Sequence, residues 1–261
     1  MKDGHVHSPY CLHGSKDSFQ TYIEKAIASG IEEISFTEHF PLPNGFEDPV
    51  KEKDSSMDLE SLEKYINELK IIKTFYAGVI KINIGVEIDY IEGYEEEIKD
   101  LLNKYGKFFE DSILSVHMVK YEDEYYCIDY SRENFAELVE LLGSVEKVYD
   151  LYYKTLKKAI NSDLGVYKPK RIGHINLVRK YNKIFPYDYS KNEILEEIVK
   201  LIKDKNYEVD YNISGLYKED CGEEYISGYL YDLIKKYHVP MVFGSDSHSC
   251  ETLGEYSLPT L

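Results

Sequence analysis

The chain has 261 residues, 43% of them hydrophobic and 30% charged, a composition typical of globular proteins. Acidic side chains number 48 against 31 basic ones, and the net charge of −17 excludes binding to nucleic acid through a basic surface. There is no apolar run long enough for a membrane helix, no signal-peptide pattern and no CxxC pair among the four cysteines. We therefore expect one cytoplasmic domain over residues 1–261, with no nucleic-acid or membrane partner.

Short β-favouring runs alternate with longer stretches of helical periodicity. The expected strands lie at 4–8, 31–39, 81–89, 111–119, 170–177, 207–214 and 239–248. The expected helices lie at 18–29, 58–76, 94–105, 131–162, 190–204 and 223–237. Ser18 should cap the first helix and Gly30 should end it. The stretches 41–56 and 121–130 are the longest irregular ones, and such loops are often functional.

This alternation predicts parallel strands joined by right-handed crossovers. No GxGxxG motif follows the first strand, so a dinucleotide-binding sheet is unsupported. No linker rich in Pro, Gly or Ser divides the chain. We therefore expect a single α/β domain, a (β/α) barrel of the TIM type with about seven repeats.

Seven of the eight histidines, with two carboxylates, fall at or just beyond the carboxyl ends of the expected strands. They are His5, His7, His13, His39, Glu87, His117, His174, Asp246 and His248. These ends form one rim of a β/α barrel, where active sites are built. A single histidine there is more often a hydrogen-bonded core residue. Seven histidines at one rim predict a metal centre, because metal ions bind the lone pairs of imidazole nitrogens that are costly to bury without a partner. His238, at a helix end, is expected to cap that helix.

Nine ligands are too many for one ion and suit two or three. After Glu87, Asp246 and a bridging hydroxide are counted, three divalent ions leave a charge of about +3 in the pocket. Such a pocket attracts a dianion to an otherwise acidic protein, and a phosphate monoester is the natural candidate. Among the arginines, Arg179 is expected to bind the phosphate, unless it is simply solvated. Arg171 ranks lower and Arg132 stays open.

The ordered motifs HVH, TEH, GVE, SVH, GH and SDSH resemble the polymerase-and-histidinol-phosphatase (PHP) family of metallohydrolases over nearly the whole chain. The segments PYCLHG and GHINLVRKY look like its histidinol-phosphate phosphatase branch. The resemblance implies a distorted (β/α)7 barrel with two or three ions of zinc, manganese or iron. It assigns one ion to His5, His7, Glu87 and Asp246, a second to Glu87, His117 and His174, and a third to His13, His39 and His248. Many members have aspartate at the position of His13, so occupancy of the third site stays open.

The resemblance implies hydrolysis of L-histidinol phosphate to L-histidinol and phosphate, a step of histidine biosynthesis, by a metal-bridging hydroxide. Glu87 is expected to bridge the ions, and Asp246 either to move the proton of the nucleophile or to act only as a ligand. Acidic and tyrosine side chains of 121–130 are expected to meet the amine and imidazole of the substrate. The alternatives are a phosphoesterase for nucleotides or phosphotyrosine proteins, a nuclease, and a non-catalytic barrel with structural metals.

Overall fold

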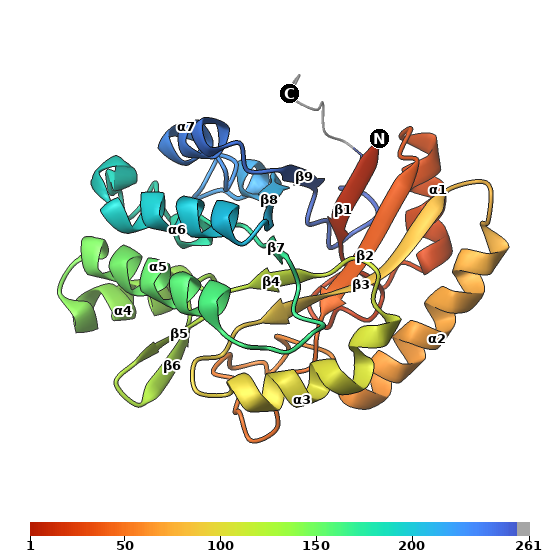
Figure 1. Ribbon diagram of the computed structural model, residues 1–261, viewed down its shortest axis with the longest axis horizontal. Helices are drawn as coiled ribbons and strands as arrows, with labels where there is room; N and C mark the ends of the chain where they lie inside the picture. Colours follow the sequence, from red (N-terminus) through yellow and green to blue (C-terminus); the bar gives the residue numbers. More distant parts are fainter. Residues whose placement is uncertain (255–261) are drawn as a thin grey trace.

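Seven parallel strands form a nearly closed barrel in the computed structural model, which describes residues 1–254 except for the side chain of Lys191 (Figure 1). The strand order is β1-β2-β3-β4-β7-β8-β9, and a parallel bridge between Val6 and Ser247 joins the two edges. The barrel strands are β1 (Lys2–Val6), β2 (Glu33–His39), β3 (Lys81–Asp89), β4 (Ile113–Ser115), β7 (Arg171–Ile172), β8 (Glu208–Asn212) and β9 (Met241–Gly244). The predicted α/β barrel is confirmed, while residues 255–261 of the expected domain lie outside the described residues.

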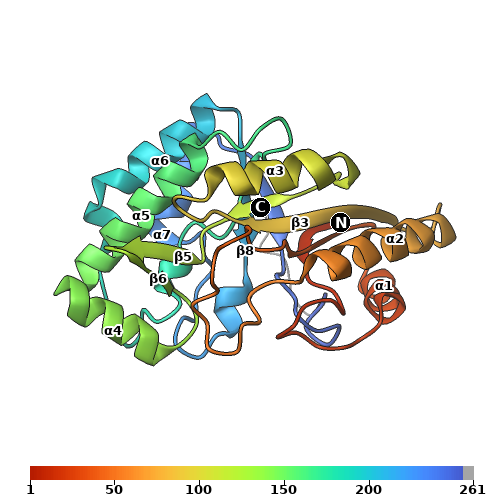
Figure 2. The same ribbon diagram turned by 90° about the horizontal axis from the view of Figure 1, so that it is seen from below.

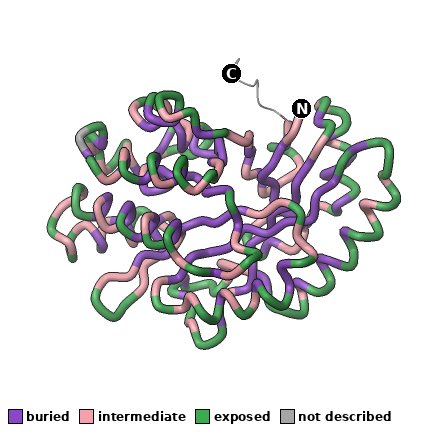
Figure 3. Tube along the Cα trace, viewed as in Figure 1, coloured by how far each residue is buried: buried purple, intermediate pink, exposed green. Residues whose placement is uncertain are grey.

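Helices surround the strands, as the two perpendicular views show (Figures 1 and 2). They are α1 (Phe19–Ala28), α2 (Leu59–Phe75), α3 (Glu95–Tyr105), α4 (Arg132–Leu142), α5 (Val145–Asn161), α6 (Glu193–Asp204) and α7 (Gly228–Tyr237). The strands are buried and the outer helix faces are exposed (Figure 3). Within the described part of the chain, no helix combines the length and the apolar character that crossing a membrane requires.

Several local signals act as expected. The Ser18 side chain accepts a hydrogen bond from the Thr21 amide and caps α1, and Gly30 follows that helix with a φ of 75°. His238 is the left-handed C-cap of α7, with a φ of 52°. That helix begins at Gly228, later than the expected 223.

Other expected boundaries also differ from the structure. The expected helix 131–162 is two helices, because Gly143 ends α4 at a φ of 85° and Ser144 caps α5. Most of the expected loop 121–130 belongs to an antiparallel hairpin of β5 (Met118–Tyr121) and β6 (Glu124–Cys127). The expected strand 170–177 has only two paired residues, since the chain turns away to place a short 3-10 helix, Leu177–Arg179, above the barrel.

One end of the barrel is filled by Arg171, whose side chain is 1% exposed. Its Nη2 donates to the Gly4 carbonyl and to Asp111, each at 2.8 Å. A Cβ atom at Gly4 would lie 2.4 Å from Nη1, so only glycine leaves room for the guanidinium. Arg171 therefore lies at the amino ends of the strands, away from the predicted rim, and the opposite end is left for the histidines.

Candidate metal centre

The carboxyl ends of the barrel strands bring all nine predicted ligands into one cluster. His5 is in β1 and His7 follows it, His39 ends β2, and Glu87 lies in β3. His117 and His174 follow β4 and β7, and Asp246 and His248 follow β9. His13 reaches the cluster from the loop before α1, where its Nε2 lies 3.2 Å from Nε2 of His248.

Glu87 is the centre of this cluster. Five imidazole rings approach its carboxylate oxygens within 3.7 Å, namely those of His5, His7, His39, His117 and His174. Its Oε1 also accepts a hydrogen bond of 2.6 Å from the Ser115 hydroxyl. The carboxylate is 1% exposed. It could therefore bridge two ions without competition from bulk water.

Asp246 is the second acidic centre. Its Oδ1 lies 3.0 Å from His7 Nε2 and 3.5 Å from His5 Nε2. Its Oδ2 accepts from the Ser214 hydroxyl at 3.0 Å. The backbone is left-handed, with a φ of 54°, a conformation that a non-glycine residue adopts at a cost of about 1–3 kcal/mol.

Three further carboxylates orient the imidazoles, and the sequence analysis missed all three. Asp210 lies 2.7 Å from Nδ1 of His5, and Asp89 lies 2.6 Å from Nδ1 of His117. Glu38 lies 3.2 Å from Nδ1 of His7. In each pair the carboxylate fixes the ring so that Nε2 faces the cluster, which is how proteins commonly prepare histidine ligands. The usable signal was an acidic residue inside a buried strand, such as Asp89 two positions after Glu87.

The buried carboxylates draw positive charge into the cluster. Burial opposes protonation of His7, but its hydrogen bonds to Asp246 and Glu38 outweigh burial and raise its pKa to about 9. Burial likewise opposes protonation of His117, and the charges of Asp89 and Glu87 raise its pKa to about 10. In contrast, burial and the neighbouring His7 lower the pKa of His248 to about 3. Protons therefore cannot satisfy all of these groups at once.

Several buried ring nitrogens lack a hydrogen-bond partner among the described residues. They are Nε2 of His5, both nitrogens of His39, and Nδ1 of His174. Leaving such nitrogens unpaired in the interior is costly, whereas a divalent cation would use their lone pairs and balance the carboxylates. The donor set of imidazoles with two carboxylates suits zinc, manganese or iron. The residues present therefore fit a metal centre.

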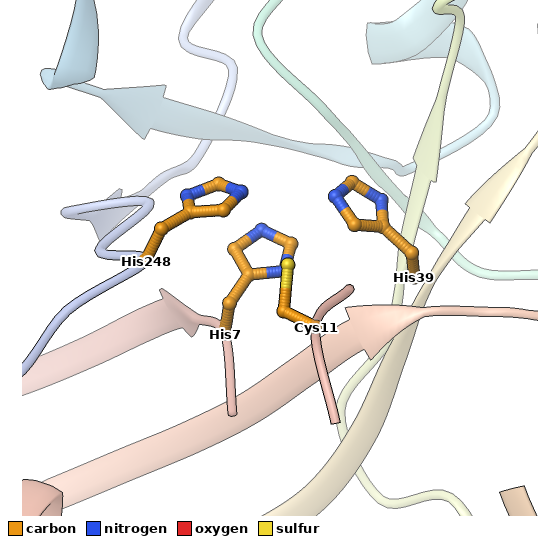
Figure 4. Close-up of side chains that lie close together, drawn as sticks. All are labelled: His7, Cys11, His39 and His248. Atoms are coloured by element: carbon orange, nitrogen blue, oxygen red, sulfur yellow. The ribbon is translucent and has the colours of Figure 1, made fainter. Parts of the chain in front are cut away.

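Cys11 is an additional member of the cluster that the sequence analysis did not predict. Its sulfur and the ring nitrogens of His7, His39 and His248 lie within 4.8 Å of one another (Figure 4). Burial raises the pKa of this thiol. Two other groups of this kind overlap predicted ligand sets. His5, His7 and Glu87 are three of the four residues of the first set, and Glu87, His117 and His174 are the whole of the second.

A cavity of about 480 Å³ opens onto the cluster, a size that suits a small-molecule ligand. Beyond the cluster, the ends of β3, β5 and β6 and the loops after β2, β6, β7 and β8 supply its walls: Val50, Glu52, Asp54, Ser55, Asp89, Met118, Cys127, Asp129, Tyr130, Leu177, Lys180, Ser214, Lys218 and Tyr225. The Tyr130 hydroxyl donates to Glu52 at 2.7 Å and so links two of these loops. Both stretches expected to be irregular thus reach the cavity, although only the end of 121–130 does so.

Arg179 does not line this cavity, contrary to the expectation that it would bind phosphate. Its guanidinium forms an ion pair with Glu223 and lies 4.3 Å from the ring centroid of Tyr189. Its Nη1 also donates to the Tyr187 carbonyl at 3.3 Å. The side chain therefore joins three segments beside the barrel. Arg132, which the sequence left open, pairs with two acidic residues at the surface.

The sequence resembles histidinol phosphatases from bacteria. The Bacillus subtilis histidinol-phosphatase is 44% identical over 255 residues, which cover 97% of this chain and 95% of the relative. The solved structure of a protein from Listeria monocytogenes, described as a histidinol phosphatase, superimposes on this chain with a TM-score of 0.94. The two chains are 36% identical, and the match covers 98% of each.

A more distant structure shares the fold. Histidinol phosphate phosphatase from Lactococcus lactis, solved with zinc, L-histidinol and phosphate, has a TM-score of 0.64 at 22% identity and covers 95% of this chain and 86% of its own. The PHP domain model matches residues 3–214, which carry all of the cluster except the two ligands after β9. With this match and the 44% identical relative, the chain belongs to the PHP domain family.

Proposed function

We propose that this protein hydrolyses L-histidinol phosphate to L-histidinol and phosphate. The observation that carries the proposal is the convergence of seven histidines, Glu87 and Asp246 in one cluster, of which all but His5 and His7 line one cavity. The name and close similarity of the Bacillus subtilis relative support the substrate. The four free cysteines and the net charge of −17 support a reducing, cytoplasmic setting and a small-molecule substrate rather than a nucleic acid.

Two or three divalent ions are proposed to occupy the cluster. His5, His7, Glu87 and Asp246 would hold one ion, Glu87, His117 and His174 a second, and His13, His39 and His248 a third. The first two sets are supported by the donor groups that converge on Glu87. When bound, such ions supply an activated water at neutral pH and neutralise phosphoryl oxygens during in-line displacement.

The protein residues have separate tasks in this reaction. Glu87 holds the two halves of the cluster together, since imidazoles from four strand ends approach its two oxygens. Asp246 must be ionised to hold a cation, and it is the proposed acceptor for the proton of the attacking water.

The mouth of the cavity supports a substrate with a cationic end. L-Histidinol phosphate carries an ammonium group and an imidazole besides its phosphate. Glu52 and Asp54 line the cavity from the loop after β2, and Tyr130 lies beside them. We infer that these side chains, rather than the whole segment 121–130, meet the amine and the ring by charge and stacking.

Phosphate release from a panel of monoesters tests the proposal. The panel contains L-histidinol phosphate, p-nitrophenyl phosphate, a nucleoside monophosphate and a phosphotyrosine peptide, assayed before and after chelation and with zinc, manganese or iron restored. Chelator-sensitive turnover with a clear preference for L-histidinol phosphate is the expected result. Equal rates across the panel would remove the substrate assignment but keep a metallophosphatase. No turnover by metal-loaded protein would mean that the centre is structural.

A further inference from the structure

A half-buried ion pair in the wall of the cavity has no role in the reaction described so far. Lys180 follows the 3-10 helix after β7, and its side chain is 22% exposed. Its Nζ donates to the carbonyl oxygen of Asp129 at 2.6 Å and to Oδ2 of the same residue at 2.9 Å. The Tyr181 hydroxyl donates to the same carbonyl at 2.8 Å, so Asp129 is held in place from a second direction.

This pair lies beside the metal cluster. Lys180 and Asp129 line the same cavity as Glu87, His117 and His174. Asp246, a proposed ligand, also lines this cavity. The lysine therefore faces the region where a phosphate on the ions would lie.

The ammonium has donor capacity to spare. A lysine ammonium carries three N–H donors, and among the described residues only Asp129 accepts from Lys180, through two oxygens. Burial opposes the charge of Lys180, but Asp129 outweighs it and raises the pKa of this lysine. The group thus stays cationic with one N–H free for the cavity.

The other cationic side chains are less suited to this task. The guanidinium of Arg179 is already engaged by Glu223 and the Tyr187 carbonyl, outside the cavity. Lys218 lines the cavity but is exposed, and ordering a long exposed side chain costs conformational entropy. Lys180 is the one that the fold has already positioned.

We propose that Lys180 binds the phosphate of the substrate and that Asp129 is the residue that positions it. The proposal rests on the phosphomonoesterase function given above and identifies the protein group that complements the ions. A charge-assisted hydrogen bond to a phosphate oxygen is about twice as strong as a neutral one. The ammonium would also bring a positive charge next to a phosphate oxygen that the ions leave free. This matters because the net charge of the chain repels anions.

Binding of inorganic phosphate to the metal-loaded protein tests this directly. Isothermal titration of phosphate is compared for the wild type, Lys180→Gln, Lys180→Arg and Asp129→Asn, with metal content and melting temperature recorded for each. Lys180→Gln is expected to weaken phosphate binding, and to raise KM for a monoester, about 10- to 100-fold. Lys180→Arg should restore most of the loss, and the metal content should stay unchanged.

The double variant separates positioning from direct contact. Asp129→Asn should weaken phosphate binding less than Lys180→Gln, and the two changes together should cost no more than Lys180→Gln alone. Lys183→Gln is the matched control, because this nearby lysine donates to the Glu219 carbonyl and does not line the cavity. If Lys180→Gln is unstable, Lys180→Arg and Asp129→Asn still report on the geometry.

Three outcomes would overturn the proposal. The first is that Lys180→Gln binds phosphate with an affinity within twofold of that of the wild type. The second is that this variant loses its metal. The third is that Arg179→Lys loses as much phosphate affinity as Lys180→Gln. Failure of the proposed function is a separate result. If the wild type releases no phosphate from L-histidinol phosphate, the substrate assignment is wrong, but the titration with inorganic phosphate still decides the role of Lys180.

Discussion

At the scale of single residues, the centre depends on carboxylates that never need to touch an ion. Asp210 is fully buried, and its Oδ2 lies 2.7 Å from Nδ1 of His5. It also accepts from the Asn212 side chain at 3.1 Å. Gly244 lets the carboxylate lie this close, since a Cβ there would be 2.2 Å from Asp210 Oδ1. The charge of Asp210 makes the His5 imidazole a stronger donor toward the cluster.

Asp210→Asn is expected to weaken metal binding about 10- to 100-fold without removing any proposed ligand. The amide keeps the shape of the side chain and a hydrogen-bond acceptor. The loss of metal affinity therefore measures the contribution of the negative charge of Asp210 beside His5. Metal affinity is measured by competition with a chromogenic chelator. Asp100→Asn, at an exposed position of α3, is the control and should leave metal affinity unchanged. Equal affinities for wild type and Asp210→Asn would show that His5 needs no charged partner.

At the scale of secondary-structure elements, the sequence predicts what periodicity and chain order determine. The alternation of strands and helices gives the barrel, and the polar residues at the ends of six of the seven expected strands give the cluster. Pairings between distant segments are not visible in that pattern. Arg179 was expected at the phosphate because it follows His174 by five residues, yet Glu223, 44 positions later, holds it elsewhere. The same applies to Asp210, whose partner His5 is 205 positions away.

The helices α6 and α7 are joined by one carboxylate. Glu196 in α6 accepts from the Tyr237 hydroxyl at 2.5 Å and from Lys236 at 2.9 Å, both in α7. These hydrogen bonds lower the pKa of Glu196 to about 2, from an ordinary value of 4.5. A carboxylate with a lowered pKa stabilises the fold fully above its unfolded value, and this contribution is lost as the pH falls from 4.5 toward 2.

Glu196→Gln is therefore expected to destabilise the protein at pH 7 and pH 5 by the same amount, and by less at pH 3.5. Urea unfolding midpoints of the variant and the wild type at these three pH values measure the difference. Added salt should reduce it at neutral pH, because the ion pairs are partly exposed. Glu140→Gln, at an exposed position of α4, serves as the control. A difference that grows on acidification would contradict this account.

At the scale of the whole molecule, the shortest pairing around the barrel is the seam where it closes. β2 and β3 are paired over seven residues in register, whereas β1 and β9 are joined through the single bridge between Val6 and Ser247. Beside that bridge, the Asp246 amide donates to the His5 carbonyl at 2.8 Å, and the His7 amide donates to the Ser247 carbonyl at 3.0 Å. The residues that border the seam are thus the proposed ligands themselves.

Removal of the ions is expected to loosen this seam before the rest of the barrel. An ion held by His5, His7 and Asp246 cross-links β1 to the segment after β9, and its loss leaves a buried carboxylate among imidazoles. At an ion concentration 100 times the Kd, each ion stabilises the fold by about 2.7 kcal/mol, which corresponds to roughly 5–10 °C in Tm for a chain of this size. Chelation should lower Tm accordingly and raise amide hydrogen exchange at 4–8 and 244–248.

The exchange pattern is the discriminating measurement, because any destabilisation lowers Tm. Amides of β2 and β3 lie in the same barrel and should keep their protection at chelator concentrations that expose the seam. Restoring zinc, manganese or iron should close the seam again. Uniform exchange across all seven strands would mean that the ions stabilise the barrel as one cooperative unit, and that the short pairing of β1 with β9 has no separate consequence.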